Sequence, residues 1–127
     1  MLKEHIYLGK SGEETAVNLL KENGYKILAR NYRTKLGEID IVALDKDTLC
    51  FIEVKTRHSD KFGLPKEAIS ASKQRQISKT ALLFLKENNL LDKKARFDVV
   101  SVIYSREQNP RLDLIKDAFD LDESFSY

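Results

Sequence analysis

Two short segments of the sequence carry residues that could do chemistry: Glu-Ile-Asp at positions 38–40 and Glu-Val-Lys at positions 53–55. Carboxylate oxygens are ligands that Mg²⁺ prefers, and one or two of them typically suffice beside water and substrate phosphate. Asp40 and Glu53 could supply the two carboxylates. Lys55 could hold or deprotonate the water that attacks phosphorus in metal-assisted hydrolysis of a phosphodiester. The two segments therefore predict a site for Mg²⁺ (or Mn²⁺).

The elements expected around these segments would bring them together. Residues 38–44 and 48–56 have the composition of strands, and residues 45–47 are typical of a tight hairpin between them. This hairpin would place Asp40 roughly opposite Glu53. Two carboxylates side by side repel one another, and charges inside an apolar sheet rarely stay there without a partner or a metal. The backbone carbonyl of Val54 could add a third oxygen ligand.

Regular alternation predicts which side chains share a face of these strands. The first strand would present Glu38, Asp40 and Val42 on one face and Ile39, Ile41 and Ala43 on the other. The second strand would present Leu49, Phe51, Glu53, Lys55 and Arg57 on one face. Glu38 could then act as an accessory residue that joins a second metal or orients water, and the alternative is an ion pair with Arg33 or Arg57. Taken alone, Glu-x-Lys on a strand would more often be a surface salt bridge.

The rest of the pattern predicts an α/β domain with the element order α-β-β-β-α-β, in which helices cover both faces of a mixed sheet. Helices are expected at residues 11–23, with Ser11 as the N-cap, and at about residues 66–86. Further strands are expected at residues 25–32 and 96–104, and residues 112–119 could form one more short strand followed by a turn of helix. Asp98 is expected to be a structural partner for a basic group.

Three segments resemble a known family, the YraN family of small bacterial proteins. They are Gly-Glu-Ile-Asp-Ile-Val-Ala at 37–43, Phe-Ile-Glu-Val-Lys-Thr-Arg at 51–57 and Arg-Asn-Tyr-Arg at 30–33, and the resemblance runs from Gly9 to Phe119. That family belongs to the restriction-endonuclease-like PD-(D/E)xK superfamily and is similar to archaeal Holliday junction resolvases. The resemblance implies a three-layer α/β/α core, which agrees with the element order predicted above.

The resemblance also implies roles for individual residues. The metal-binding acid of the superfamily falls on Asp40, its second acid on Glu53 and its lysine on Lys55. Ile39 stands where many members have proline, a departure that leaves the chemistry unchanged. Because most members of the family are uncharacterised, the resemblance implies a nuclease core without a demonstrated substrate.

The superfamily often adds a glutamate from the first helix, and this chain offers Glu13 and Glu14 there. Helical geometry favours Glu13, which would share a face with the apolar residues Ala16, Val17 and Leu20. The alternative for both glutamates is that they complement the helix dipole in the first turn, which needs no metal.

Basic residues around the motifs predict contacts with a polyanion. Between Lys55 and Lys79 there are seven basic and two acidic residues. Arginine binds phosphate bidentately, so the candidate phosphate ligands are Arg30, Arg33 and Arg57. The candidate ligands on the second helix are Lys73, Gln74 and Arg75, of which Gln74 resembles the helix glutamine that some relatives aim at the active site. The alternative for Arg75 is a solvated helix face.

Length and composition limit the class of protein. The 127 residues, with a net charge of +2, fit one domain that spans 1–127, with a core at about 9–119 and an acidic C-terminal tail. Cys50 is the one cysteine, so an intramolecular disulfide and a cysteine zinc site are excluded. No apolar run has the length of a membrane span and no signal peptide is evident, so a cytoplasmic protein is expected, without a membrane partner.

Together these features predict a Mg²⁺-dependent endonuclease acting on DNA, with branched or structured DNA as one candidate substrate and RNA not excluded. The alternative is a non-catalytic nucleic-acid-binding module that keeps the nuclease fold. A third interpretation is a scaffold protein whose acidic tail docks another chain. A homodimer is an analogy with the resolvases, which cut a four-way junction symmetrically, and the sequence itself shows no dimer seam.

Overall fold

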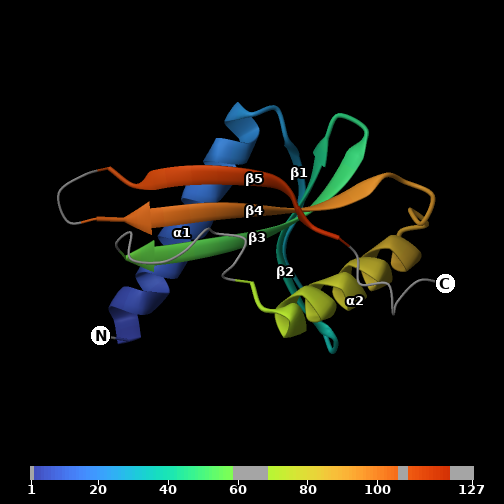
Figure 1. The fold of residues 1–127 in the computed structure, drawn as a ribbon, viewed down its shortest axis with the longest axis horizontal. Coiled ribbons are helices and arrows are strands. Elements are labelled where there is room, and N and C mark those ends of the chain that lie inside the picture. The colour runs from blue at the N-terminus through green and yellow to red at the C-terminus, as the bar shows by residue number, and fades with distance from the viewer. Residues whose placement is uncertain (1, 59–68, 106–108, 121–127) are drawn as a thin grey trace.

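The structure is a computed structural model, and it describes residues 2–58, 69–105 and 109–120, with only the backbone described for residues 2–11 (Figure 1). The elements follow in the order α1 (Leu2–Glu22), β1 (Lys26–Thr34), β2 (Gly37–Asp45), β3 (Thr48–His58), α2 (Ala71–Glu87), β4 (Ala95–Tyr104) and β5 (Arg111–Phe119). None of the helices in these described ranges is long and apolar enough to cross a membrane.

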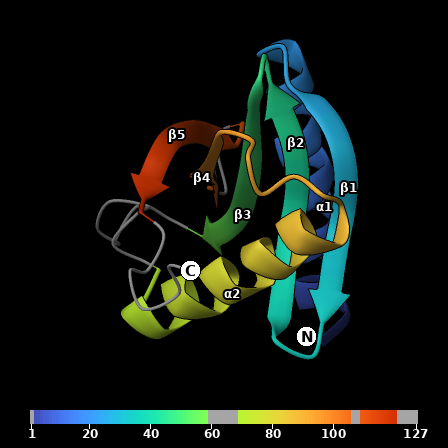
Figure 2. The ribbon, with the colours of Figure 1, turned by 90° about the vertical axis from the view of Figure 1, so that its right-hand side faces the viewer.

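The strands form one mixed sheet in the order β1-β2-β3-β4-β5. β3 and β4 are parallel, and the other neighbours are antiparallel. The connection between the parallel strands contains α2, which lies on the face of the sheet opposite α1 (Figures 1 and 2). The predicted α/β class, the mixed sheet and the order α-β-β-β-α-β are thus confirmed, with β5 added at the end.

Each helix buries its apolar stripe on one face of the sheet. On the α1 face, Ala16, Val17 and Leu20 pack against strand residues that include Ile41, Cys50, Ile52 and Val100. On the α2 face, Ile77, Ala81 and Phe84 pack against Val42, Phe51, Phe97 and Val99. Burial of each large apolar side chain contributes about 1.5–3 kcal/mol, so these two layers supply most of the driving force that fixes the sheet.

Both helices begin at residues other than those predicted. α1 begins at Leu2, so the prediction of Ser11 as its N-cap is wrong; a single glycine such as Gly9 costs a helix only about 1 kcal/mol and did not end it. α2 begins at Ala71, because Ser70 is extended (φ −64°, ψ 159°) and its hydroxyl accepts a hydrogen bond from the Lys73 N–H at 3.1 Å. Residues 66–68 of the predicted helix lie outside the described residues.

The last element is a continuous nine-residue strand, so the predicted turn of helix at its end is wrong. Leu112 and Leu114 pack on the α1 face, whereas Ile115 and Phe119 pack on the α2 face. The register with β4 shifts between Phe97 and Val99, and Asp117 has a positive φ of 55°. This bulge breaks the alternation that would have identified the strand from its sequence.

Candidate metal centre

The candidate centre lies where β2 and β3 stop pairing. The ladder between these strands runs from Asp45 and Thr48 to Ile41 and Ile52, so Asp40 comes directly after the last paired residue. Its carboxylate accepts a hydrogen bond from the Val54 N–H at 2.8 Å. A side-chain oxygen therefore takes the place that a strand carbonyl would have in a continued ladder.

Asp40 interrupts the alternation of β2. Ile39 belongs to the core on the α2 face and Ile41 to the core on the α1 face, although residues at i and i+2 of a regular strand share a face. The prediction that Ile39 and Ile41 lie on the same face is therefore wrong. The alternation predicted for β3 is correct, since Leu49 and Phe51 lie on the α2 face and Cys50 and Ile52 on the α1 face.

The carboxyl groups of Asp40 and Glu53 lie close enough to shift each other's pKa; Asp40 is half-buried and Glu53 is buried. Burial, and after it the neighbouring Asp40 charge, raises the pKa of Glu53 above its usual value. Burial also raises the pKa of Asp40, although the Val54 N–H opposes the shift. Burial disfavours the ionised form of each carboxyl group, and two neighbouring carboxylates also repel one another, so one proton shared by the pair is favoured.

This electrostatic arrangement fits a divalent cation, because a cation between two desolvated carboxylates would remove the repulsion that now favours protonation. Within the described ranges, no three His, Cys, Asp or Glu side chains stand close enough to form a metal site by themselves. Two carboxylates completed by water and substrate phosphate are the typical Mg²⁺ arrangement, so the donor set fits Mg²⁺ better than it fits a closed structural metal site.

Two lysines act on the pair. The Lys73 ammonium, in the first turns of α2, lies 3.9 Å from Glu53 Oε1. Lys55 follows Glu53 by two residues on β3, so it shares the α2 face, and its charge also favours the ionised form of Glu53. The structure thus brings Asp40, Glu53, Lys55 and Lys73 together.

Glu13 faces the same place from α1. Burial, and after it the charge of Asp40, raises the pKa of Glu13, and the neighbouring Asn31 side chain opposes the shift. The close approach of α1 depends on Gly12, because a Cβ there would collide with the Thr56 side chain on β3. The dipole alternative for Glu13 does not hold, because α1 begins at Leu2 and the dipole effect is confined to the first turn.

Asn31 was missed by the sequence analysis, and it stands out in the structure. It lies in the middle of β1 with a positive φ of 54°, between the pairs that Arg30 and Tyr32 make with β2, and therefore beside Asp40. A left-handed backbone within a strand is uncommon, and such outliers concentrate at functional sites. The available signal was the residue type, since asparagine tolerates this conformation better than most residues.

Several predicted phosphate ligands are engaged with acids instead. Arg30 pairs with Glu14 at 2.7 Å, which also takes Glu14 away from the metal centre. Arg33 pairs with Glu38 across the β1–β2 ladder at 3.2 Å, so the ion-pair alternative for Glu38 is present in the structure. Arg33 remains mostly exposed.

The other predicted ligands are spread over β3 and α2. Arg57 lies at the outer end of β3, four residues beyond Glu53. The Gln74 amide donates to the Ile69 carbonyl at 3.0 Å, and Arg75 is exposed. Gln76 was missed, and it lines a surface hollow together with Lys73.

Ser101 was missed as well. It is buried on β4 opposite Lys55, and among the described residues its hydroxyl is the one buried side-chain polar atom without a hydrogen-bond partner. A lone serine within an apolar strand gives no signal in the sequence. Its position places an unused donor beside the carboxylate pair.

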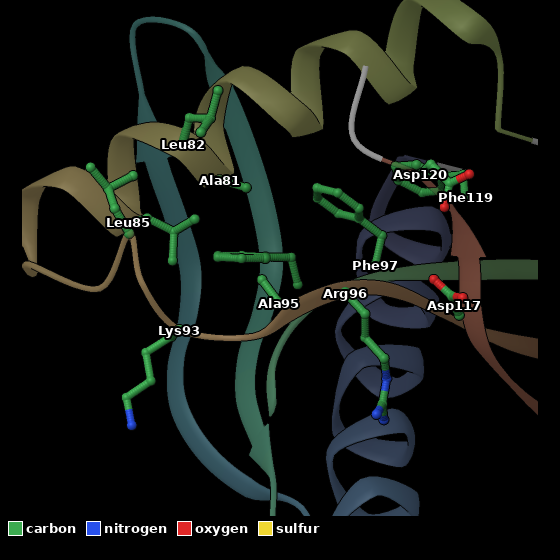
Figure 3. A pocket seen from close by; sticks show the side chains of 12 residues that line it. Ala81, Leu82, Leu85, Lys93, Ala95, Arg96, Phe97, Asp117, Phe119 and Asp120 are labelled. Atoms are coloured by element: carbon green, nitrogen blue, oxygen red, sulfur yellow. The ribbon is translucent and has the colours of Figure 1, made fainter. Parts of the chain in front are cut away.

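An apolar cavity of about 250 Å³ lies elsewhere, between the end of α2 and the start of β4 (Figure 3). Leu82 and Leu85 of α2, Phe97 of β4 and Phe119 of β5 line it. None of the carboxyl groups of the candidate centre lines this cavity, so the chemistry argued above does not depend on it.

Comparison with known proteins identifies close relatives. A family model described as "Uncharacterised protein family UPF0102" matches residues 12–102. A UPF0102 protein of Syntrophus aciditrophicus is 49% identical over 120 residues, which cover 94% of each chain. UPF0102 proteins of Geotalea daltonii and Caldicellulosiruptor saccharolyticus are 50% and 52% identical over 114 residues, which cover 90% and 88% of this chain and 90% and 96% of theirs.

Proposed function

The chain belongs to the uncharacterised protein family UPF0102, and from its site we propose that it is a metal-dependent nuclease that hydrolyses phosphodiester bonds in DNA. The observation that carries the proposal is the interacting pair of carboxyl groups formed by the half-buried Asp40 and the buried Glu53, at the point where β2 and β3 separate. Carboxylates with a purely structural role usually have basic or hydrogen-bonding partners that stabilise their ionised form. Burial instead raises the pKa of both Asp40 and Glu53, which is typical of carboxylates at functional sites.

Each residue of the centre has a role in this proposal. Asp40 and Glu53 would hold the cation, with the Val54 carbonyl as a further oxygen ligand. Glu13, whose carboxylate interacts with the Asn31 side chain, would become a ligand only after a shift toward the pair, because the three carboxylates do not form a metal site by themselves. When bound, Mg²⁺ or Mn²⁺ would supply Lewis-acid stabilisation of the phosphoryl oxygens and a water of lowered pKa. Lys55 Nζ orients the attacking water and accepts or donates its proton. Lys55 is half-buried, and its place two residues after Glu53 on β3 keeps it on the same face as Glu53.

The proposal extends to the fold and the substrate. Two helices on opposite faces of a mixed sheet, with the acids at a strand separation, agree with the restriction-endonuclease-like core that the sequence resemblance implies. Lysine and arginine side chains beside the centre favour a polyanionic substrate. Branched DNA is the first substrate to test, and two symmetric cuts in it would need a homodimer.

The second candidate is a nucleic-acid-binding module without cleavage. It is favoured by one observation, that the described residues contain no complete cage of three metal ligands. In that case DNA binding would weaken with salt but would not respond to EDTA or to loss of the Glu53 carboxylate.

Incubation of the protein with branched and linear DNA in Mg²⁺ or Mn²⁺ tests the proposal. We expect cleavage that is lost in Asp40→Asn and Glu53→Gln and by at least tenfold in Lys55→Met, since removal of a group that handles the proton typically costs about 10²–10⁴-fold. Asp47→Asn is the matched control, because Asp47 is an exposed acid on the β2–β3 hairpin. Its ion pair with Lys94, at 3.5 Å, is exposed to solvent. Absence of cleavage with every substrate, or cleavage that survives Asp40→Asn, would overturn the proposal.

A further inference from the structure

The Lys73 side chain lies between the carboxylate pair and a polar hollow on the surface. Its ammonium is 3.9 Å from Glu53 Oε1, and the same side chain lines a polar hollow of about 390 Å³. The hollow lies between the start of α2 and the β1–β2 turn, and its lining includes Arg33, Lys35, Gln76 and Glu38. We infer that Lys73 is a movable counter-ion of the carboxylate pair, which a divalent cation displaces and a substrate phosphate then binds. This inference rests on the metal site of the proposed function.

The local structure of α2 shows why the carboxylates, and not the helix, hold this ammonium in place. Ser70 is the N-cap, so Lys73 stands in the first turn, where the helix dipole disfavours a cation. The first turn contains no acidic residue that would compensate. The negative charge that favours Lys73 at this position is therefore that of Asp40 and Glu53, both of which its charge helps to ionise.

The ion pair between Lys73 and Glu53 is weak enough for a metal cation to replace the ammonium. Its separation is at the outer limit for a salt bridge, and the Lys73 side chain is 34% exposed, whereas the Glu53 side chain is 9% exposed. Glu53 is therefore fixed in the sheet while Lys73 can swing on its four-carbon chain. A cation between Asp40 and Glu53 would neutralise the charge that holds the ammonium. Lys73 would then be a free cation at the positive end of a helix.

The hollow offers the released ammonium an anion. Gly37 allows α2 to lie against the β1–β2 turn, because a Cβ at this glycine would stand 2.5 Å from Gln76 Cγ. This contact keeps the end of β1, with Arg33, and the following turn, with Lys35, beside Lys73. Of the charged lining residues, Glu38 is already paired with Arg33 at 3.2 Å. A phosphate of the substrate backbone next to the cleaved bond fits this excess of positive charge.

The inference predicts a coupling between the two ligands. In the wild-type protein the metal must displace Lys73, and a phosphate that binds Lys73 makes this displacement easier. DNA and metal should therefore each raise the affinity for the other by the same factor. Without the Lys73 charge, metal should bind more tightly and DNA more weakly. The mutual increase in affinity should become smaller, because only direct coordination of a phosphate by the cation would still couple the two binding events.

Titration of the full chain with Mn²⁺, followed by the loss of the free-ion EPR signal, tests the first part. A partly exposed ion pair is worth up to about 1 kcal/mol, so we expect Lys73→Met to lower the dissociation constant for Mn²⁺ by roughly two- to fivefold. Lys86→Met is the matched control, because Lys86 lies in the last turn of the same helix and is exposed, and it should leave the constant unchanged. The folded state of each variant is checked by its thermal unfolding.

Fluorescence anisotropy with a phosphorothioate-protected DNA duplex tests the second part. Mn²⁺ should increase duplex affinity in the wild type and in Lys86→Met, and this increase should be smaller in Lys73→Met. Unchanged or weaker Mn²⁺ binding by Lys73→Met, or an undiminished coupling in it, would overturn the inference while leaving the metal site in place. The expected pattern in a protein that never cleaves DNA would support the inference and overturn only the nuclease activity.

Discussion

Two acidic clusters lie in the same sheet, one fully buried and one partly buried, and they differ in how their charge is balanced. Asp98 on β4 is fully buried on the α1 face, and each of its oxygens has several donors. The pair of Asp40 and Glu53 lies one strand away and has only part of its charge balanced. The contrast is between a carboxylate whose charge is fully paired within the fold and two carboxylates whose charge is not, which are the ones proposed to bind a cation.

The Asp98 cluster is complete. Arg96 donates to both oxygens of Asp98 at 3.0 and 3.2 Å, and the Tyr25 hydroxyl and the Asp117 N–H donate at 2.9 Å each. Arg96 also pairs with Asp45 at 2.6 Å. Burial disfavours the guanidinium charge, but the bonds to Asp98 and Asp45 outweigh it and raise the pKa of Arg96. The prediction that Asp98 is a partner for a basic group is confirmed.

The Asp40 and Glu53 pair is incomplete by comparison. The Val54 N–H donates to Asp40 at 2.8 Å, and the Lys73 ammonium lies 3.9 Å from Glu53. A buried charge that is fully paired holds a fold in one arrangement, whereas an under-neutralised pair carries an electrostatic cost that a cation would remove. The cost is therefore expected to be visible in stability measurements.

The largest predicted effect breaks the complete cluster. Asp98→Asn keeps the shape but removes the buried charge that pairs with the half-buried Arg96 guanidinium, which keeps Asp45 as a partner. Loss of one partner of a buried ion pair costs up to about 3–5 kcal/mol. Urea unfolding should show this decrease in the free energy of unfolding at neutral pH. A decrease below about 1 kcal/mol would remove the contrast between the two clusters.

A change of opposite sign is predicted at the incomplete pair. Glu53→Gln removes one of two competing carboxylates, so the metal-free protein should be more stable at pH 8, by on the order of 1 kcal/mol, since each unit of raised pKa corresponds to about 1.4 kcal/mol. Urea unfolding of Glu53→Gln, Asp98→Asn and the wild type under the same conditions compares their free energies of unfolding. Destabilisation by Glu53→Gln would mean that the pair supports the fold as Asp98 does.

The pH dependence of the unfolding free energy tests the raised pKa of Glu53 separately. The pKa of Glu53 is raised in the folded state, so its protonated form adds stability at low pH, and this contribution is lost as the pH rises from the ordinary glutamate value through the raised one. The metal-free wild type should therefore lose stability across this window relative to Glu53→Gln. Parallel curves of unfolding free energy against pH for the two proteins would contradict the raised pKa.

A smaller effect is predicted at Asn31. Alanine disfavours the left-handed backbone by roughly 1–2 kcal/mol, whereas glycine adopts it freely, so Asn31→Ala should lower the unfolding free energy and Asn31→Gly should not. Both variants lose the amide that holds Glu13, so both should bind Mn²⁺ more weakly. Wild-type Mn²⁺ affinity in Asn31→Gly would show that this amide does not support the site.

The smallest effect is predicted at Ser101. Ser101→Ala removes a buried hydroxyl that has no partner among the described residues, so stability should stay within about 1 kcal/mol of wild type or rise. If this hydroxyl contacts a ligand beside Lys55, cleavage or Mn²⁺ binding should fall at unchanged stability. A clear loss of stability would show that the hydroxyl contributes to folding.

The sequence predicted the meeting of Asp40 and Glu53 because strand period and hairpin length are local properties. It did not predict the break in alternation at Asp40, since that break depends on a side chain taking the place of a backbone carbonyl. The helix start at Leu2 was missed because weak signals such as Gly9 and Ser11 were outweighed by helix-forming neighbours.

Partners that are distant in the chain were the least predictable. Tyr25 and Asp98 are 73 positions apart, and nothing local to either indicates the other. Lys73 was predicted only as a nucleic-acid contact, because its approach to Glu53 depends on where α2 lies on the sheet. The sequence pattern thus predicted which two carboxylates meet at the strand separation, while the packing of α1 and α2 determined which other charged side chains lie beside them.

Isothermal titration of the full chain with Mn²⁺ tests the central claim most directly. One site per chain is expected in the wild type and in Asp47→Asn, and no measurable binding is expected in Asp40→Asn or Glu53→Gln. Binding that is absent from the folded wild type, or that persists unchanged in Glu53→Gln, would contradict the assignment of these two carboxylates to a metal centre.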